Sequence, residues 1–152
     1  LDRLVPRLED RGFRVRALSL GACGDDGTSP FAVTIHTWAN DICTAAESMN
    51  TPKVLLGHSM GGYPISLAGE KRPDLFNTLI ISKFRWTEEK LGSIREHYIE
   101  CTLDKALTPT QQRALQTHME FTTVRRLEAD HSPFLAMPER LAALIEELPP
   151  GV

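Results

Sequence analysis

The sequence contains few cysteines and few aromatic residues, and it has neither a long apolar run nor an excess of basic residues. Its 152 residues include three cysteines, Cys23, Cys43 and Cys101, whose wide spacing contains no Cys-x-x-Cys pair. This pattern indicates neither a zinc site nor a disulfide framework. We interpret the three cysteines as buried or half-buried free thiols, and we expect a reducing, cytoplasmic compartment.

The apolar segments are short, as in Val54-Leu55-Leu56, whereas a transmembrane helix needs about 20 apolar residues in succession. The net charge is −3, and no basic stripe alternates with aromatic residues, so a nucleic-acid surface is not indicated. No phosphate-binding glycine loop and no metal-ligand spacing occurs in the sequence. We therefore expect a small-molecule substrate, no nucleic-acid or membrane partner, and no cofactor or metal.

Helices and strands are predicted to alternate along a single domain over residues 1–152. Apolar periodicity predicts helices over 1–12, 34–50, 60–71 and 135–148, and a helix of about twelve residues opened by Thr108-Pro109. The predicted strands are 13–18, 53–56, 78–81, 97–101 and 124–127, with a loop over 21–30 and an ambiguous polar segment over 83–96. This order predicts an α/β fold, with a mostly parallel sheet and helices on both faces. Functional groups are then expected at the carboxyl ends of the strands.

The segment Gly57-His58-Ser59-Met60-Gly61 follows a predicted strand and opens a predicted helix, which is the setting of a nucleophile elbow. We expect Gly57 and Gly61 to omit side chains where the backbone is crowded. Ser59 is then strained and exposed, and it is the predicted nucleophile. The backbone N–H of Met60 is the predicted donor to the oxyanion.

A serine nucleophile needs a general base, and the predicted base is His131. His131 lies in the loop after the last predicted strand, at the sheet edge where the elbow should also lie. The remaining histidines fall in positions where a structural or solvated role is expected, namely a helix entrance, the elbow itself, the start of a strand and a helix interior: His36, His58, His97 and His118.

The third catalytic residue should orient the imidazole and lie between the serine and the histidine in chain order. Asp104, which follows predicted strand 97–101, is the leading prediction. The alternatives are Asp74, which lies close behind the elbow helix, and Glu100, which falls within the strand. Asp130 is adjacent to His131 and cannot easily reach its ring.

Three blocks of sequence together resemble the α/β-hydrolase superfamily, and within it the branch of plant methylesterases, hydroxynitrile lyases and bacterial esterases. They are Gly57–Gly62, Tyr98–Leu107 followed by Gln111 or Gln112, and Asp130-His131-Ser132-Pro133-Phe134. The resemblance implies a triad of Ser59, Asp104 and His131. It also implies an enzyme that hydrolyses small carboxylic esters through an acyl-enzyme.

Two parts of the family pattern are expected to be missing. The chain opens with Leu1, just after the place of the N-terminal strand and its His-Gly loop, which normally supplies a second oxyanion donor. Only 83–96 stands where the family inserts a helical cap, so we expect a shortened, capless fold. The chain is thus interpreted as a fragment, a processed form or a shortened gene product, and pairing in a homodimer would supply the missing strand.

Two other functions compete with ester hydrolysis. The missing segments favour a non-catalytic or degenerate member of the fold that binds a ligand. A lyase of the hydroxynitrile type is less favoured, because the resemblance implies a cap-side lysine that has no match in this sequence.

Overall fold

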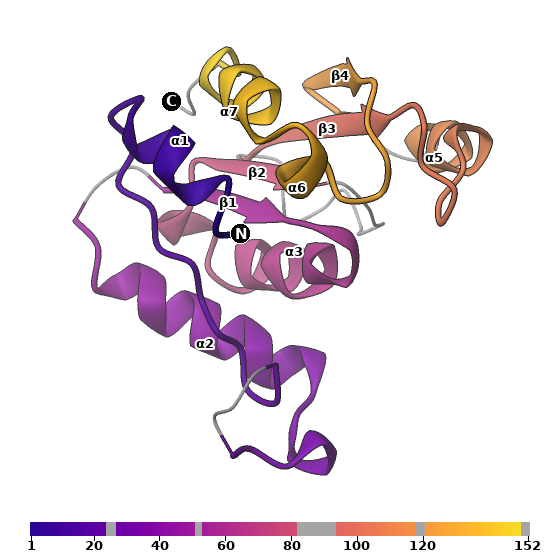
Figure 1. Cartoon of the computed structure of the whole chain (residues 1–152). Helices are drawn as coiled ribbons and strands as arrows, with labels where there is room; N and C mark the ends of the chain where they lie inside the picture. Colours follow the sequence, from indigo (N-terminus) through magenta and orange to yellow (C-terminus); the bar gives the residue numbers. More distant parts are fainter. Residues whose placement is uncertain (24–26, 51–52, 82–93, 118–120, 150–152) are drawn as a thin grey trace. The chain divides into compact units, whose positions relative to one another are not determined.

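The computed structural model, drawn in Figure 1, divides into two compact units. It describes residues 1–23, 27–50, 53–81, 94–117 and 121–149. The central unit comprises Leu18–Glu96. The terminal unit joins the two ends of the chain, Leu1–Ala17 and His97–Pro149.

The central unit is built around two parallel strands and two helices. Its elements, in chain order, are η1 (Pro30–Ala32), α2 (Ile35–Glu47), β1 (Val54–Gly57), η2 (Ser59–Gly61), α3 (Gly62–Lys71), η3 (Pro73–Leu75) and β2 (Thr78–Ile81). Strand β1 pairs with β2 in parallel, with Val54 opposite Thr78 and Gly57 opposite Ile81. A parallel pair requires a crossover connection, and α3 provides it.

The core of the central unit lies where α2 and α3 pack together (Figure 1). Helix α2 begins at Thr34, whose hydroxyl accepts a hydrogen bond from the N–H of Thr37, while the Thr37 hydroxyl accepts one from the N–H of Thr34. This reciprocal cap satisfies two of the donors that a helix start leaves open. The core cluster consists of Ala39, Ile42, Cys43, Ala46, Ile65, Leu67, Ala68, Phe76, Leu79 and Ile94.

The terminal unit contains the second parallel pair. Its elements are α1 (Val5–Glu9), most of β3 (Arg95–Cys101), α5 (Pro109–Gln116), β4 (Thr123–Leu127), α6 (Pro133–Ala136) and α7 (Pro138–Glu146). Strand β3 pairs with β4 so that His97 lies opposite Thr123 and Cys101 opposite Leu127.

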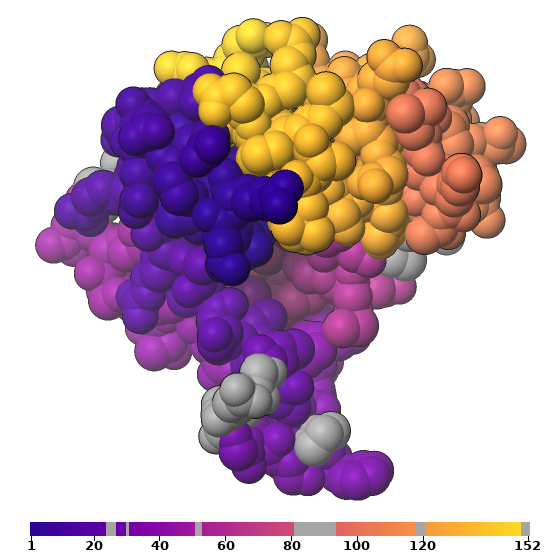
Figure 2. Space-filling model, in the orientation of Figure 1, coloured from indigo at the N-terminus to yellow at the C-terminus, as the bar shows by residue number. Residues whose placement is uncertain are grey.

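The two ends of the chain meet in the terminal unit, where α1 packs against α7. Figure 2 shows the indigo atoms of the first residues against the yellow atoms of the last helices. Buried Leu4 and Leu8 supply the apolar part of the α1 side. At its margin Arg11 forms ion pairs with Glu139 at 2.6 Å and with Glu146 at 3.2 Å. Exposed ion pairs of this kind are screened by water and contribute little to stability, so apolar burial is the larger stabilising term.

The predicted α/β fold with a parallel sheet is confirmed, and four of the five predicted strands are found. The expectation of a strand over 13–18 is wrong, although half-buried Phe13 and Val15 do alternate with exposed arginines. Alternation describes a half-buried surface, but a strand also needs a hydrogen-bonded neighbour, and none is recorded for this segment among the described residues.

The closing helix is also corrected, because the predicted 135–148 helix is divided into α6 and α7 at Met137. Met137 has φ −137° and ψ 54°, outside the helical region. The following residue is Pro138, whose ring disfavours a helical conformation in the residue before it. The ambiguous segment 83–96 lies mostly outside the described residues, as does His118.

Candidate active site

Ser59 occupies a strained position between β1 and α3. It is the first residue of η2, two residues after the end of β1, and its φ of 52° lies in the left-handed region. Non-glycine residues avoid this region because Cβ crowds the backbone, and such strain persists only where the surrounding structure imposes it. The sharp strand-to-helix turn predicted for a nucleophile elbow is therefore present at Ser59.

The two glycines that flank the turn differ in their surroundings. A Cβ atom added to Gly57 would lie 2.6 Å from Ile65 Cδ1 and 2.8 Å from the carbonyl oxygen of Gly61. A Cβ added to Gly61 would meet no atom within 4 Å. The expectation of backbone crowding is thus confirmed for Gly57 and wrong for Gly61, because it is the Gly61 backbone that occupies the space beside Gly57.

Met60 follows Ser59 in η2, and its side chain is exposed. Its N–H belongs to the first turn of a helical segment, where backbone donors have no acceptor within the helix. This is the type of donor that can stabilise an anion at the start of a helix.

In the terminal unit the structure brings Asp104 and His131 together. His131 Nδ1 lies 2.9 Å from Asp104 Oδ2, and the other carboxylate oxygen accepts the backbone N–H groups of Ala106 at 2.8 Å and Leu107 at 2.9 Å. Asp104 is 7% exposed, and the side chain of His131 is 32% exposed. A buried carboxylate thus faces a histidine that remains accessible to a reactant.

The surroundings of Asp104 favour its charged form. Burial opposes ionisation, but hydrogen bonds from the N–H of Leu107, from His131 and from the N–H of Ala106 outweigh it, and the pKa of Asp104 falls below its usual value. The carboxylate therefore remains ionised over the physiological range, so it can hold the imidazole in one orientation and stabilise its protonated form.

The parallel pairing of β3 and β4 brings the two loops to the same edge. Beyond the strands, the N–H of Thr102 donates to the carbonyl of Leu127 at 2.9 Å, and the N–H of Leu103 donates to the carbonyl of Ala129 at 3.0 Å. These bonds tie the loop that carries Asp104 to the loop that carries His131. The two loops meet because the carboxyl ends of parallel strands lie at the same edge of a sheet, which is where functional groups were expected.

The alternative acids have other partners in the structure. Glu100 is buried within β3 and accepts hydrogen bonds from Arg113 and Gln116, with Arg126 at 3.5 Å. Asp130 accepts the N–H of Ser132, and Asp74 pairs with Arg72 at 2.7 Å in the central unit. Among the described carboxylates, Asp104 is the one recorded within hydrogen-bond distance of the His131 ring.

Two of the other histidines also lie where a non-catalytic role was expected. His97 is fully buried in β3, with Nδ1 2.8 Å from the Thr123 hydroxyl. His36 is exposed near the start of α2. Ser59 and Met60 belong to the central unit, and Asp104 and His131 belong to the terminal unit.

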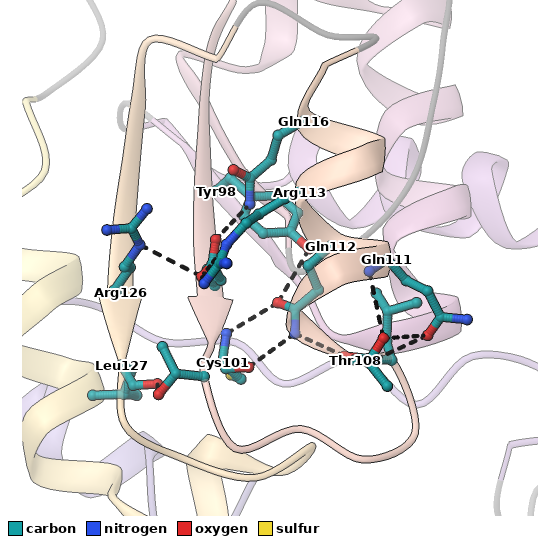
Figure 3. Close-up of polar contacts among 12 residues, drawn as sticks. Tyr98, Cys101, Thr108, Gln111, Gln112, Arg113, Gln116, Arg126 and Leu127 are labelled. Atoms are coloured by element: carbon teal, nitrogen blue, oxygen red, sulfur yellow. Dashed lines mark hydrogen bonds and ion pairs between the residues drawn. The ribbon is translucent and has the colours of Figure 1, made fainter.

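Gln112 is a polar residue whose structural role the sequence does not predict. It lies on α5, is 2% exposed, and uses its side-chain amide to bind the end of β3 and the loop after it (Figure 3). A signal exists in the sequence, since Gln112 shares the inward face of its helix with Leu115, and a polar residue at such a position needs a partner.

Comparison with known proteins identifies relatives of this chain. No protein-family model matches it. It is 39% identical over 119 residues to Methylesterase 8 of Arabidopsis thaliana, covering 64% of this chain and 44% of that protein. It is also 35% identical over 80 residues to a pyrethroid hydrolase of Sphingobium wenxiniae, covering 52% of this chain and 29% of that protein. The chain spans less than half the length of these curated relatives.

Solved structures extend the comparison to the fold. A polyneuridine aldehyde esterase superposes with a TM-score of 0.86 at 16% identity, over 96% of this chain and 92% of that chain. A pyrethroid hydrolase from Sphingobium faniae superposes with a TM-score of 0.84 at 22% identity, over 96% and 90%. The parallel strands, the strained serine turn and these superpositions define an α/β-hydrolase fold. In sequence the chain is similar to two Arabidopsis thaliana proteins, Methylesterase 8 and putative methylesterase 11, chloroplastic, the second at 29% identity over 133 residues.

Within the described residues, no helix is long and apolar enough to cross a membrane. In the same part of the chain, no group of three or more His, Cys, Asp or Glu side chains is placed to hold a metal ion.

Proposed function

We propose that this chain carries the catalytic residues of a serine hydrolase that acts on small carboxylic esters. The observation that carries the proposal is the left-handed conformation of Ser59 at a crowded strand-to-helix turn. The 2.9 Å contact between His131 and Asp104 supports it, because a serine hydrolase needs an oriented histidine. The names of the relatives, two of which are a methylesterase and a pyrethroid hydrolase, support ester hydrolysis as the reaction.

In the proposed reaction, Ser59 Oγ attacks the acyl carbon while His131 removes its proton. Because His131 Nδ1 contacts Asp104, the basic nitrogen is Nε2. The N–H of Met60 donates to the oxyanion, and the protonated His131 returns its proton to the leaving alcohol. Water, activated by the same histidine, then hydrolyses the acyl-enzyme and restores the Ser59 hydroxyl.

The proposed catalytic residues are divided between the two units. Ser59 comes from the central unit and His131 from the terminal unit, so the proton transfer joins residues from both. The proposed substrates are small carboxylic esters as a class.

A fluorophosphonate probe tests the nucleophile directly. We expect covalent labelling of the folded chain at Ser59, identified by peptide mass spectrometry, with no labelling of Ser59→Ala. Ser19→Ala, which alters an exposed serine of the same unit, is the matched control and should label like the parent chain. Absence of labelling at Ser59 in a folded chain would contradict the proposal and favour a non-catalytic, ligand-binding role.

Turnover of p-nitrophenyl acetate tests the base. Loss of a triad member typically lowers kcat by about 10⁴-fold or more, so His131→Ala should remove almost all activity. His36→Ala replaces an exposed histidine and should leave the rate unchanged. Equal rates for the His131→Ala variant and the parent chain would exclude His131 as the base.

A further inference from the structure

The loop that carries Asp104 is held at both ends by one buried side chain, that of Gln112. Gln112 lies on α5, eight residues after Asp104, and its side chain is almost completely removed from solvent. Its Oε1 accepts the N–H of Cys101 at 3.0 Å. Its Nε2 donates to the carbonyl of Cys101 at 2.9 Å and to that of Leu107 at 2.8 Å (Figure 3).

These bonds use both amide hydrogens of Gln112. The Tyr98 hydroxyl adds a longer contact to Oε1 at 3.4 Å, which completes the set of four. A primary amide offers two donors and one acceptor oxygen in one plane, so no other uncharged side chain of this length can satisfy the N–H and C=O of Cys101 together with the C=O of Leu107.

The position of the anchored residues links Gln112 to the acid. Cys101 lies three residues before Asp104 and Leu107 three residues after it. Leu107 is bound from both sides, because its carbonyl accepts from Gln112 and its N–H donates to Asp104 Oδ1. The backbone that orients the Asp104 carboxylate is thus attached directly to the Gln112 amide.

We propose that Gln112 is a positioning residue, which holds the 102–107 loop so that Asp104 faces His131. The inference rests on the proposed function for its effect on rate, but its geometric part stands on the contacts in the terminal unit. Gln112 itself touches neither Asp104 nor His131 in any recorded hydrogen bond, so it acts through the loop. Without it, the carbonyls of Cys101 and Leu107 would be left to compete for other donors, and the loop would shift.

The test compares Gln112→Met with Gln111→Met. Methionine matches glutamine in length but cannot replace its hydrogen bonds, and Gln111 is the exposed neighbour that caps the same helix through Thr108. The geometric readout is the downfield proton resonance of the His131 Nδ1–H in the whole chain, assigned by its loss in His131→Ala. We expect this resonance in the parent chain and in Gln111→Met, and its loss or marked broadening in Gln112→Met.

The kinetic readout is the hydrolysis of p-nitrophenyl acetate. We expect kcat to fall about 10- to 100-fold in Gln112→Met, with KM little changed, because a displacement below 1 Å at a catalytic group has effects of this size. Gln111→Met should stay within about twofold of the parent chain. An unaltered resonance together with an unaltered kcat in Gln112→Met would overturn the inference.

A second variant keeps the test decisive if Gln112→Met does not fold. In Gln112→Glu a protonated carboxyl restores the acceptor and one donor, whereas the ionised form restores the acceptor alone. Burial beside the carbonyl oxygens of Cys101 and Leu107 should raise the pKa of the introduced carboxyl well above its usual value of about 4.3. The kcat of Gln112→Glu relative to the parent chain should therefore rise as the pH falls from about 8 to about 5, and a flat ratio would contradict the inference. If the parent chain shows the resonance but no ester turnover, the proposed function fails, while loss of the resonance in Gln112→Met still supports the positioning role.

Discussion

Replacing each glycine of the Ser59 turn by alanine should give opposite results, although the Gly-x-Ser-x-Gly pattern treats the two glycines alike. In Gly57→Ala the new Cβ would lie 2.8 Å from the Gly61 oxygen and 3.0 Å from its carbon, whereas ordinary contacts begin near 3.4 Å. The nearby Ile65 Cδ1, at 2.6 Å, is the end of a flexible side chain and can rotate away. The Gly61 carbonyl is backbone, so the turn itself must open by about half an ångström.

Opening the turn in Gly57→Ala should lower the stability of the chain. Overpacking of a well-packed site costs about 1–3 kcal/mol in the free energy of unfolding. For a chain of 152 residues this lowers the melting temperature by about 3–10 °C. Ser59 lies two residues after Gly57, and a displacement of its backbone should lower the rate of fluorophosphonate labelling by about tenfold or more.

Gly61→Ala should behave differently. Gly61 has φ −63° and ψ −16°, which alanine adopts readily, and no atom lies within 4 Å of the added Cβ. The substitution should be neutral or stabilise the chain by about 0.4–1 kcal/mol, because alanine restricts the unfolded state.

Urea denaturation followed by circular dichroism measures both effects, and the labelling rate reports the serine. The reasoning is refuted if Gly57→Ala matches the parent chain in stability and labelling rate. It is also refuted if Gly61→Ala is as damaging as Gly57→Ala, since the structure places the crowding at Gly57 alone of the two.

Three further predictions concern the terminal unit and the thiols. Asp104→Asn should lower the kcat of p-nitrophenyl acetate hydrolysis by about 10³–10⁴-fold with little change in secondary structure, because the amide cannot stabilise protonated His131; unchanged kcat would exclude the acid role. Burial opposes the charge on Glu100, but its arginine and glutamine partners lower its pKa below 4.5, so its contribution to stability is present above pH 4.5 and is lost as the pH falls through the lowered pKa. Melting temperature should therefore fall more steeply on acidification in the parent chain than in Glu100→Gln, and parallel curves would contradict this. The expectation that all three thiols are buried or half-buried is wrong for Cys23, which is exposed and should react rapidly with Ellman's reagent at pH 8. Buried Cys101, whose pKa is raised by burial to about 11, should react only on unfolding, and rapid reaction of Cys101 in the folded chain would contradict its burial.

Much of the site is predictable because its signals are local. A short apolar strand, a Gly-x-Ser-x-Gly turn and a helix occur within one continuous segment, so Ser59 can be recognised from its neighbours in sequence. The same reasoning places Asp104 and His131 after strands, since turns that follow parallel strands gather at one sheet edge.

One error of prediction arises where distant backbone decides the outcome, and the other arises where a local signal was outweighed by apolar periodicity. The alternation of Phe13 and Val15 with arginines is correct as a pattern of burial, but it does not reveal whether a neighbouring strand is present. The apolar periodicity of 135–148 predicts one continuous helix, but Pro138 disfavours a helical conformation at Met137 and so divides it. This proline can be seen in the sequence.

The sequence by itself determined the order of the four parallel strands, the Gly-x-Ser-x-Gly turn between the first of them and a helix, and the residue types available for the proposed triad, because these follow from short-range periodicity and covalent geometry. Only the tertiary structure decided which carboxylate faces His131, which glycine is crowded, and which glutamine holds the 102–107 loop. Each of those depends on backbone atoms far apart in the chain approaching to within about 3 Å, through the parallel pairing of β3 with β4 and the packing of α5 beside the end of β3. Hydrogen bonds and close contacts act only over such short distances, and the spacing of residues along the chain does not encode which distant atoms approach so closely.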